Sequence, residues 1–169
     1  VTLDVYNPKS VEIIKGLVST SDIIVESFHP GTMKALGISY ETLSELNPKI
    51  VMASLTHYGQ EGPYKEYLGS DITSYALSGY MYLTGDEDRE PLKAGGRQSE
   101  YQCGLSGALS IVAALIGRLF SNKGQYIDVS ATESLTSTFD GVGYFRTYER
   151  SGIEPLRAGT RLIAREPSA

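Results

Sequence analysis

Short apolar runs alternate along this chain with longer segments in which apolar residues recur every three or four positions. Residues 1–5 alternate apolar and polar side chains, which predicts a short strand. Residues 23–25 and 50–53 are continuous apolar runs, as expected of strands buried on both faces of a parallel sheet. Residues 125–129 predict one more strand, after a turn at Lys123.

Helical patterns occupy the segments between these strands. Asn7 and Pro8 are typical of a helix cap and a first helical residue, and the apolar positions after them share one face. The alternation of strands and helices predicts an α/β fold with a parallel sheet. The segment 100–120 is apolar nearly all round and is expected to be central. The expected helices span residues 8–18, 30–37, 40–46, 71–83, 100–120 and 132–150.

Three loops rich in glycine and proline mark a candidate binding edge. They contain Pro30-Gly31, Gly62-Pro63 and Gly95-Gly96. In an open α/β sheet, ligands bind beside the carboxyl ends of the strands. We therefore expect these loops to converge at that edge.

Ser99 and Gln102 predict a capping box at the head of the long apolar helix. Glu100 would then be the first residue inside the helix, where unpaired N–H groups and the helix dipole favour a carboxylate. Such a carboxylate is a candidate nucleophile. The alternative is that Glu100 only stabilises the helix, as acidic residues in a first turn commonly do.

Composition removes several classes of function. The 169 residues carry a net charge of −5 without a basic run, which argues against nucleic-acid binding. Two histidines and one cysteine match no zinc spacing, so no metal site is expected. No glycine-rich phosphate loop of the common kinds is present.

The single cysteine and the longest apolar run indicate the cellular compartment. Cys103 cannot form an internal disulfide, which suits a reducing compartment, and its place inside a helix argues against a thiol nucleophile. The apolar run 108–119 is short for a membrane span and contains Arg118. We expect a cytoplasmic protein without a membrane segment.

An ordered series of motifs resembles family III CoA-transferases. This family includes formyl-CoA and carnitine CoA-transferases and the related α-methylacyl-CoA racemases. The matching segments run in family order: DIIVESFHPG at 22–31, LGISYETL at 36–43, NPKIV at 47–51, GQEGPY at 59–64, GSD at 69–71, ALSG at 76–79 and KGQ at 123–125.

The resemblance implies a Rossmann-like large α/β domain with a parallel sheet, incomplete in this chain. Residues 1–150 would be part of that domain and residues 151–169 a linker, so the chain is expected to be an internal fragment. The resemblance also implies an interlocked homodimer. The substrates would be a coenzyme A thioester and a carboxylic acid, with no permanently bound cofactor.

The family register also selects Glu100. The family nucleophile is an aspartate four residues before a glycine, and counting back from Gly104 reaches Glu100. Other departures are Ser27 in place of the family asparagine and His29 in place of the family arginine. Contacts with CoA are implied for Phe28, His29, Pro30, Gly31, Lys34, Tyr58 and Gly59.

Two alternatives stay open at this point. A racemase of the same superfamily would need a histidine base directly before Asp71, where this chain has Ser70. A serine hydroxyl is too weak a base to replace it. The substitutions at Ser27, His29 and Glu100 also suit a catalytically inactive protein that binds acyl-CoA.

Overall fold

A three-stranded parallel sheet forms the centre of the structure. This computed structural model describes residues 2–138 and 148–150, together with residues 152, 154, 157 and 159. The strands are β1 (Ile23–Glu26), β2 (Val51–Thr56) and β3 (Gln125–Ser130), in the order β1-β2-β3. Ala53 pairs with Val25 on one side and with Ile127 on the other. The predicted α/β class with a parallel sheet is confirmed.

The helices surround this sheet in the chain order that the sequence predicts. Asn7 caps the first helix by accepting from the Lys9 amide. The described helices are α1 (Pro8–Val18), α2 (Thr32–Ala35), α3 (Tyr40–Leu46), α4 (Asp71–Leu77), α5 (Tyr80–Leu83), α6 (Gln98–Ser121) and α7 (Ala131–Ser137).

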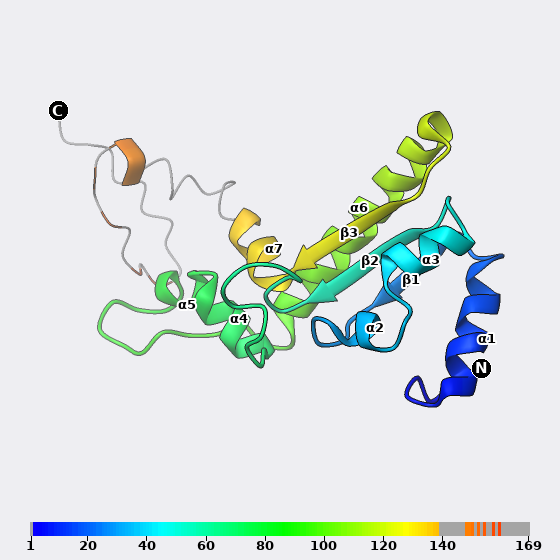
Figure 1. Ribbon diagram of the computed structural model, residues 1–169. Coiled ribbons are helices and arrows are strands. Elements are labelled where there is room, and N and C mark those ends of the chain that lie inside the picture. The colour runs from blue at the N-terminus through cyan, green and yellow to red at the C-terminus, as the bar shows by residue number, and fades with distance from the viewer. Residues whose placement is uncertain are drawn as a thin grey trace.

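Two small cores hold the layers together. One joins Val18 of α1 and Leu43 of α3 to Met52 of β2, and all three are buried. The other lies under α6, where Cys103 packs with Val129 at the end of β3. Figure 1 shows α3 in front of the sheet and the long α6 behind it. The arrangement is therefore helix on sheet on helix.

Small residues let α6 approach the sheet closely. A Cβ added at Gly107 would stand 3.0 Å from the Leu55 side chain, so a larger residue would push the helix away. At the far end of the helix, Arg118 donates to the Lys49 carbonyl at 2.9 Å and to the Asp22 carboxylate at 2.8 Å. This end is therefore fixed to the segments that precede β1 and β2.

Several predicted elements differ from the structure. Within the predicted strand at 1–5, residues 2–4 are irregular and residues 5 and 6 form a turn. The predicted helix 71–83 is broken into α4 and α5 at Gly79, whose φ of 88° is left-handed and suits glycine. Of the predicted helix 132–150, α7 is observed, whereas residues 139–147 lie outside the described residues.

The prediction that β1 is buried on both faces is wrong in this chain. β1 is an edge strand of the described sheet, and Val25 is 56% exposed. The apolar run correctly marked a strand, but no described element covers this face of Val25.

The outer face of α6 is exposed, although the sequence predicted a central helix. Its sheet side buries Cys103 and Ala114, whereas the opposite side exposes large apolar residues. Within the described residues, α6 is also the one helix long and apolar enough to cross a membrane by length and composition. The exposed apolar residues are Leu105, Leu109, Val112, Ile116, Leu119 and Phe120.

This face predicts that residues 1–169 expressed alone self-associate, because exposed contiguous apolar surface drives association in water. Leu119→Glu should shift the population towards monomer, since Leu119 is 80% exposed on that face. Light scattering coupled to size-exclusion chromatography measures the change. The matched control is Ser121→Glu, which adds the same charge at an exposed polar position of α6. A monodisperse monomer of the unaltered chain would contradict the prediction.

Candidate active site

A cavity of ≈510 Å³ opens at the carboxyl edge of the sheet. Its walls come from the loop after β1, the end of β2, the following loop at residues 65–69 and the first turns of α6. Of the three glycine–proline-rich pairs expected to converge here, Pro30 lines the cavity, whereas Gly62-Pro63 and Gly95-Gly96 do not. The lining includes Glu100 together with four of the residues for which CoA contacts were expected. These four are Phe28, His29, Pro30 and Tyr58.

Local hydrogen bonds shape the two loops that carry these residues. The Phe28 amide donates to the buried Glu26 carboxylate at 2.7 Å, which turns the chain as it leaves β1. On the neighbouring loop, the Tyr58 hydroxyl donates to Thr73 of α4 at 2.8 Å. The Phe28 backbone and the Tyr58 side chain are therefore held by contacts with residues that do not line the cavity.

The other three residues for which CoA contacts were expected lie apart from this cavity. Gly31 and Lys34 line a neighbouring cavity of ≈220 Å³. Gly59, with a φ of 83°, lies against Asp128, and a Cβ there would stand 3.4 Å from the carboxylate. Burial raises the pKa of Asp128, partly offset by the hydrogen bond from the Gln60 amide. Gly59 thus packs against β3 and lines neither cavity.

The predicted capping box at Ser99 and Gln102 is wrong. The helix begins at Gln98, one residue before Ser99, and Arg97 is the N-cap without a side-chain capping bond. Ser99 is fully buried, and its amide and hydroxyl both donate to Asp71 Oδ1, at 2.9 and 2.7 Å. The N-terminus of α6 is therefore capped by a carboxylate 28 residues earlier in the chain. Glu100 nevertheless lies in the first turn, as expected.

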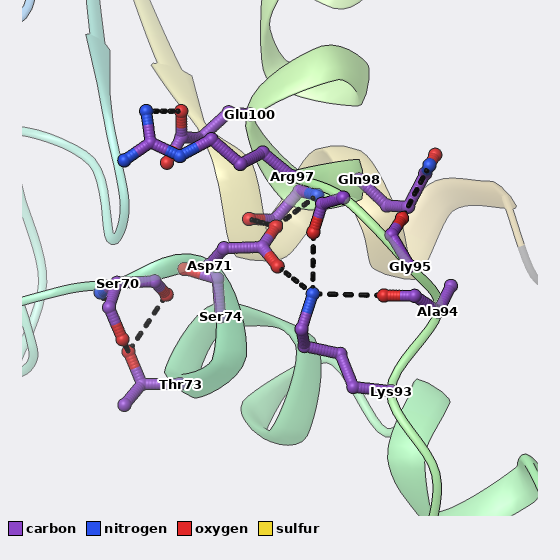
Figure 2. Close-up of polar contacts among 12 residues, drawn as sticks. Ser70, Asp71, Thr73, Ser74, Lys93, Ala94, Gly95, Arg97, Gln98 and Glu100 are labelled. Atoms are coloured by element: carbon purple, nitrogen blue, oxygen red, sulfur yellow. Dashed lines mark hydrogen bonds and ion pairs between the residues drawn. The ribbon is translucent and has the colours of Figure 1, made fainter.

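Lys93 completes this arrangement by holding the second oxygen of Asp71. Its Nζ lies 2.5 Å from Asp71 Oδ2 and also donates to the carbonyls of Ala94 and Gly96 (Figure 2). Burial alone would raise the pKa of the Asp71 carboxyl. The hydrogen bonds from Lys93 and Ser99 outweigh burial, so the pKa of Asp71 lies below its usual value. Asp71 is thus held as a carboxylate that joins α4, the loop before α6 and α6 itself.

Glu100 has a different and more open environment. Its Oε2 lies 3.2 Å from Nη1 of Arg97, and the two side chains are 37% and 72% exposed. Figure 2 shows the Arg97 side chain running alongside the first turn to reach Glu100. The carboxylate therefore has one cationic neighbour and access to the cavity.

Cys103 also lines the cavity, but its chemistry differs from that of Glu100. Burial raises the pKa of the Cys103 thiol to about 11, assisted by the charges of Asp128 and Glu100. The thiol is therefore protonated near neutral pH. Because the thiolate is the nucleophilic form, this agrees with the expectation that Cys103 is no nucleophile.

His57 is a cavity residue that sequence reasoning did not select, although it follows a predicted strand. Its Nδ1 lies 2.9 Å from the Ser74 hydroxyl. A Cβ at Gly69 would overlap the His57 side chain, 2.2 Å from its Cβ, so glycine is required there. Lys65 also lines the cavity and adds a cation. Among the described residues, no group of three metal-binding side chains is assembled.

The Asp71 arrangement predicts a pH-dependent stability. Asp71→Asn in the full-length protein should lower the free energy of unfolding by about 1–3 kcal/mol at pH 7, as for other hydrogen bonds to charged groups. Because the pKa of folded Asp71 is lowered, its stabilisation is present above the unfolded value of 3.8 and is lost as pH falls through the folded value. Urea denaturation at several pH values measures this.

Asp22→Asn is the matched control for this experiment. It removes a carboxylate that is 76% exposed and paired with Arg118, so its effect should stay below about 1 kcal/mol. Equal destabilisation by the two variants, or a difference that persists unchanged into acid, would contradict the structural role of Asp71.

The chain is similar in sequence to proteins named as CoA-transferases. The chain is 33% identical over 159 residues to succinate–glutarate CoA-transferase of Agrobacterium fabrum, covering 94% of this chain and 39% of that protein. It is 36% identical over 134 residues to human succinyl-CoA:glutarate CoA-transferase, covering 79% and 31%. It therefore spans between 31% and 39% of the length of these relatives.

The fold and the family model agree with these similarities. A crystal structure of a CAIB/BAIF family protein from Brucella suis superposes with a TM-score of 0.89 at 33% identity, covering 94% of this chain and 42% of that one. The family model described as CoA-transferase family III matches residues 1–168. The chain therefore belongs to CoA-transferase family III.

Proposed function

We propose that the full-length protein moves CoA from an acyl-CoA thioester to a carboxylic acid, with Glu100 as the nucleophile. One observation carries this proposal: the Glu100 carboxylate lies in the first turn of α6 and lines the cavity at the carboxyl edge of the sheet. Relatives named as CoA-transferases for glutarate and for oxalate support the reaction class.

A carboxylate can carry this transfer in balanced steps. Glu100 attacks the donor thioester carbon, forming a C–O bond as the C–S bond breaks, which yields a mixed anhydride and CoA thiolate. The thiolate then attacks the Glu100 carbonyl carbon and expels the donor acid, leaving an enzyme–CoA thioester. The acceptor carboxylate displaces CoA from this thioester, and the thiolate then attacks the acceptor acyl carbon, which restores Glu100. Covalent catalysis divides one difficult exchange into easier steps.

The first turn of α6 is well suited to these steps. Each addition to a carbonyl develops negative charge on oxygen, which backbone N–H groups can stabilise. The Ser99 amide is already used by Asp71, so Ser99 is not available as such a donor. The Cys103 thiol lines the same cavity in its protonated form, which supports the proposal that the carboxylate rather than the thiol is the nucleophile.

We assign binding of CoA to the basic and aromatic side chains around the cavity. His29 and Lys65 border the cavity and Lys34 the neighbouring one, so they can face the phosphates of an extended CoA chain. Phe28 and Tyr58 offer apolar surface for the thioester arm.

The interlocked homodimer and the cytoplasmic location remain part of this proposal. One relative is named as the β subunit of a succinyl-CoA–L-malate CoA-transferase.

The racemase and the inactive binding protein are the alternatives that an experiment must separate. Ser70 lies at the head of α4, where its amide donates to the Thr73 hydroxyl at 2.9 Å, so it serves the helix end. Exchange of the α-proton of a 2-methylacyl-CoA in heavy water would favour the racemase. Binding of acyl-CoA without any modification of Glu100 would favour the inactive protein.

The nucleophile is tested by Glu100→Gln in the full-length enzyme. The amide keeps the size of the side chain but cannot form the anhydride, so we expect transfer to fall by several orders of magnitude while acyl-CoA still binds. Glu100→Asp moves the carboxylate by about 1 Å and should lose roughly 100-fold in rate if the cavity is shaped for glutamate. Transfer from succinyl-CoA and formyl-CoA to their paired acids measures both variants.

Glu133→Gln is the matched control. Glu133 is an exposed acid in the first turn of α7 that does not line the cavity, so its replacement removes the same kind of helix-end charge without altering the cavity wall. Its transfer rate should stay near that of the native enzyme. Near-native transfer by Glu100→Gln would refute the assignment and return Glu100 to a helix-stabilising role.

A further inference from the structure

The Arg97–Glu100 ion pair differs from the other ion pair at this helix end. Lys93 and Asp71 are largely buried, and each makes further hydrogen bonds. Arg97 is 72% exposed, and its guanidinium lies 3.2 Å from the Glu100 carboxylate. Figure 2 shows the Arg97–Glu100 pair separate from the contacts of Lys93 with Asp71. Arg97 can therefore exchange its partner without disturbing the cap of α6.

The proposed cycle removes the charge of Glu100 at two stages. Both the anhydride and the enzyme–CoA thioester are uncharged at Glu100, whereas a guanidinium keeps its charge throughout. Arg97 is then left without its carboxylate, beside the carbonyl carbon that must react. The next substrate is itself a carboxylate, and its attacking oxygen must come within about 3–3.5 Å of that carbon.

From this geometry we infer that Arg97 is a binding site for the acceptor carboxylate, open only while the charge of Glu100 is removed in the anhydride or the thioester. The inference rests on the proposed function. Glu100 occupies the guanidinium in the resting enzyme and so competes with free acids. In the thioester, the acceptor takes the place that Glu100 has left. A carboxylate oxygen then attacks the Glu100 carbonyl carbon, a C–O bond forms, and the C–S electron pair leaves with CoA.

The same contact also serves the opposite direction. Expulsion of the donor acid from the anhydride is the reverse of acceptor attack, so Arg97 receives the departing carboxylate as well. The planar fork of arginine can hold a carboxylate through two parallel hydrogen bonds, whereas lysine supplies a point charge. The site therefore selects for carboxylates as a class, independent of the rest of the acid.

The test compares an anionic and a neutral nucleophile on one preformed intermediate. Full-length enzyme is loaded with succinyl-CoA or formyl-CoA and desalted, and the enzyme–CoA thioester is confirmed by mass spectrometry. It is then reacted with succinate or with hydroxylamine. In Arg97→Gln the rate with succinate should fall about 10–100-fold, the range of a lost hydrogen bond to a charged group. The rate with hydroxylamine should stay unchanged, and Arg97→Lys should recover part of the succinate rate.

Arg89→Gln is the matched control. Arg89 is also 72% exposed and pairs with Asp86 three residues away, so both variants remove an equally exposed arginine. The ratio of the rate with succinate to the rate with hydroxylamine in Arg89→Gln should equal that of the native enzyme. Equal rate losses with succinate and hydroxylamine in Arg97→Gln would overturn the inference, because Arg97 would then only position Glu100. Native rates with both nucleophiles in Arg97→Gln would overturn the inference too. Failure of the native enzyme to form a thioester from either donor would instead contradict the proposed function.

Discussion

The arrangement of the site depends on the hydrogen bonds and the ion pair of the Asp71 carboxylate. This carboxylate accepts from the amide and hydroxyl of Ser99 with one oxygen and holds Lys93 with the other. Ser99 is fully buried, so without this partner its polar groups would be desolvated and unpaired, which is costly. The start of α6 is thereby fixed to α4, and Glu100 follows one residue later.

Two ion pairs of opposite character share this helix end. The buried pair of Lys93 and Asp71 has its remaining hydrogen-bonding groups engaged, which suits a permanent support. The exposed pair of Arg97 and Glu100 is screened by water and costs little to open. A nucleophile that must lose its charge during a reaction is better placed in the second kind of pair, because losing it leaves no buried charge uncompensated.

Local patterns predicted most of the fold. The helices α1 and α3 begin and end at the predicted residues, because a proline or serine start and a regular apolar face are encoded within each segment. The capping of α6 was not predictable in this way, since the partner of Ser99 is 28 residues distant and only the fold brings it near. The exposure of Val25 in β1 was equally hidden, because an apolar run marks a strand without showing which elements cover it. For the site, the register found Glu100. The sequence placed His57 after a strand, but only the fold shows that His57 lines the same cavity as Glu100.

The long helix α6 is held at both ends, by Asp71 at its start and by Arg118 near its finish. Adding or deleting a residue within it would rotate everything beyond by about 100° and shift it by about 1.5 Å. One of the two ends would then have to be released. Changes in the backbone therefore have little freedom to move the Glu100 carboxylate, which we propose as the nucleophile. Side-chain length is the variable that remains, and a glutamate in place of a shorter acid is the smallest step by which such a lineage can reach further into its cavity.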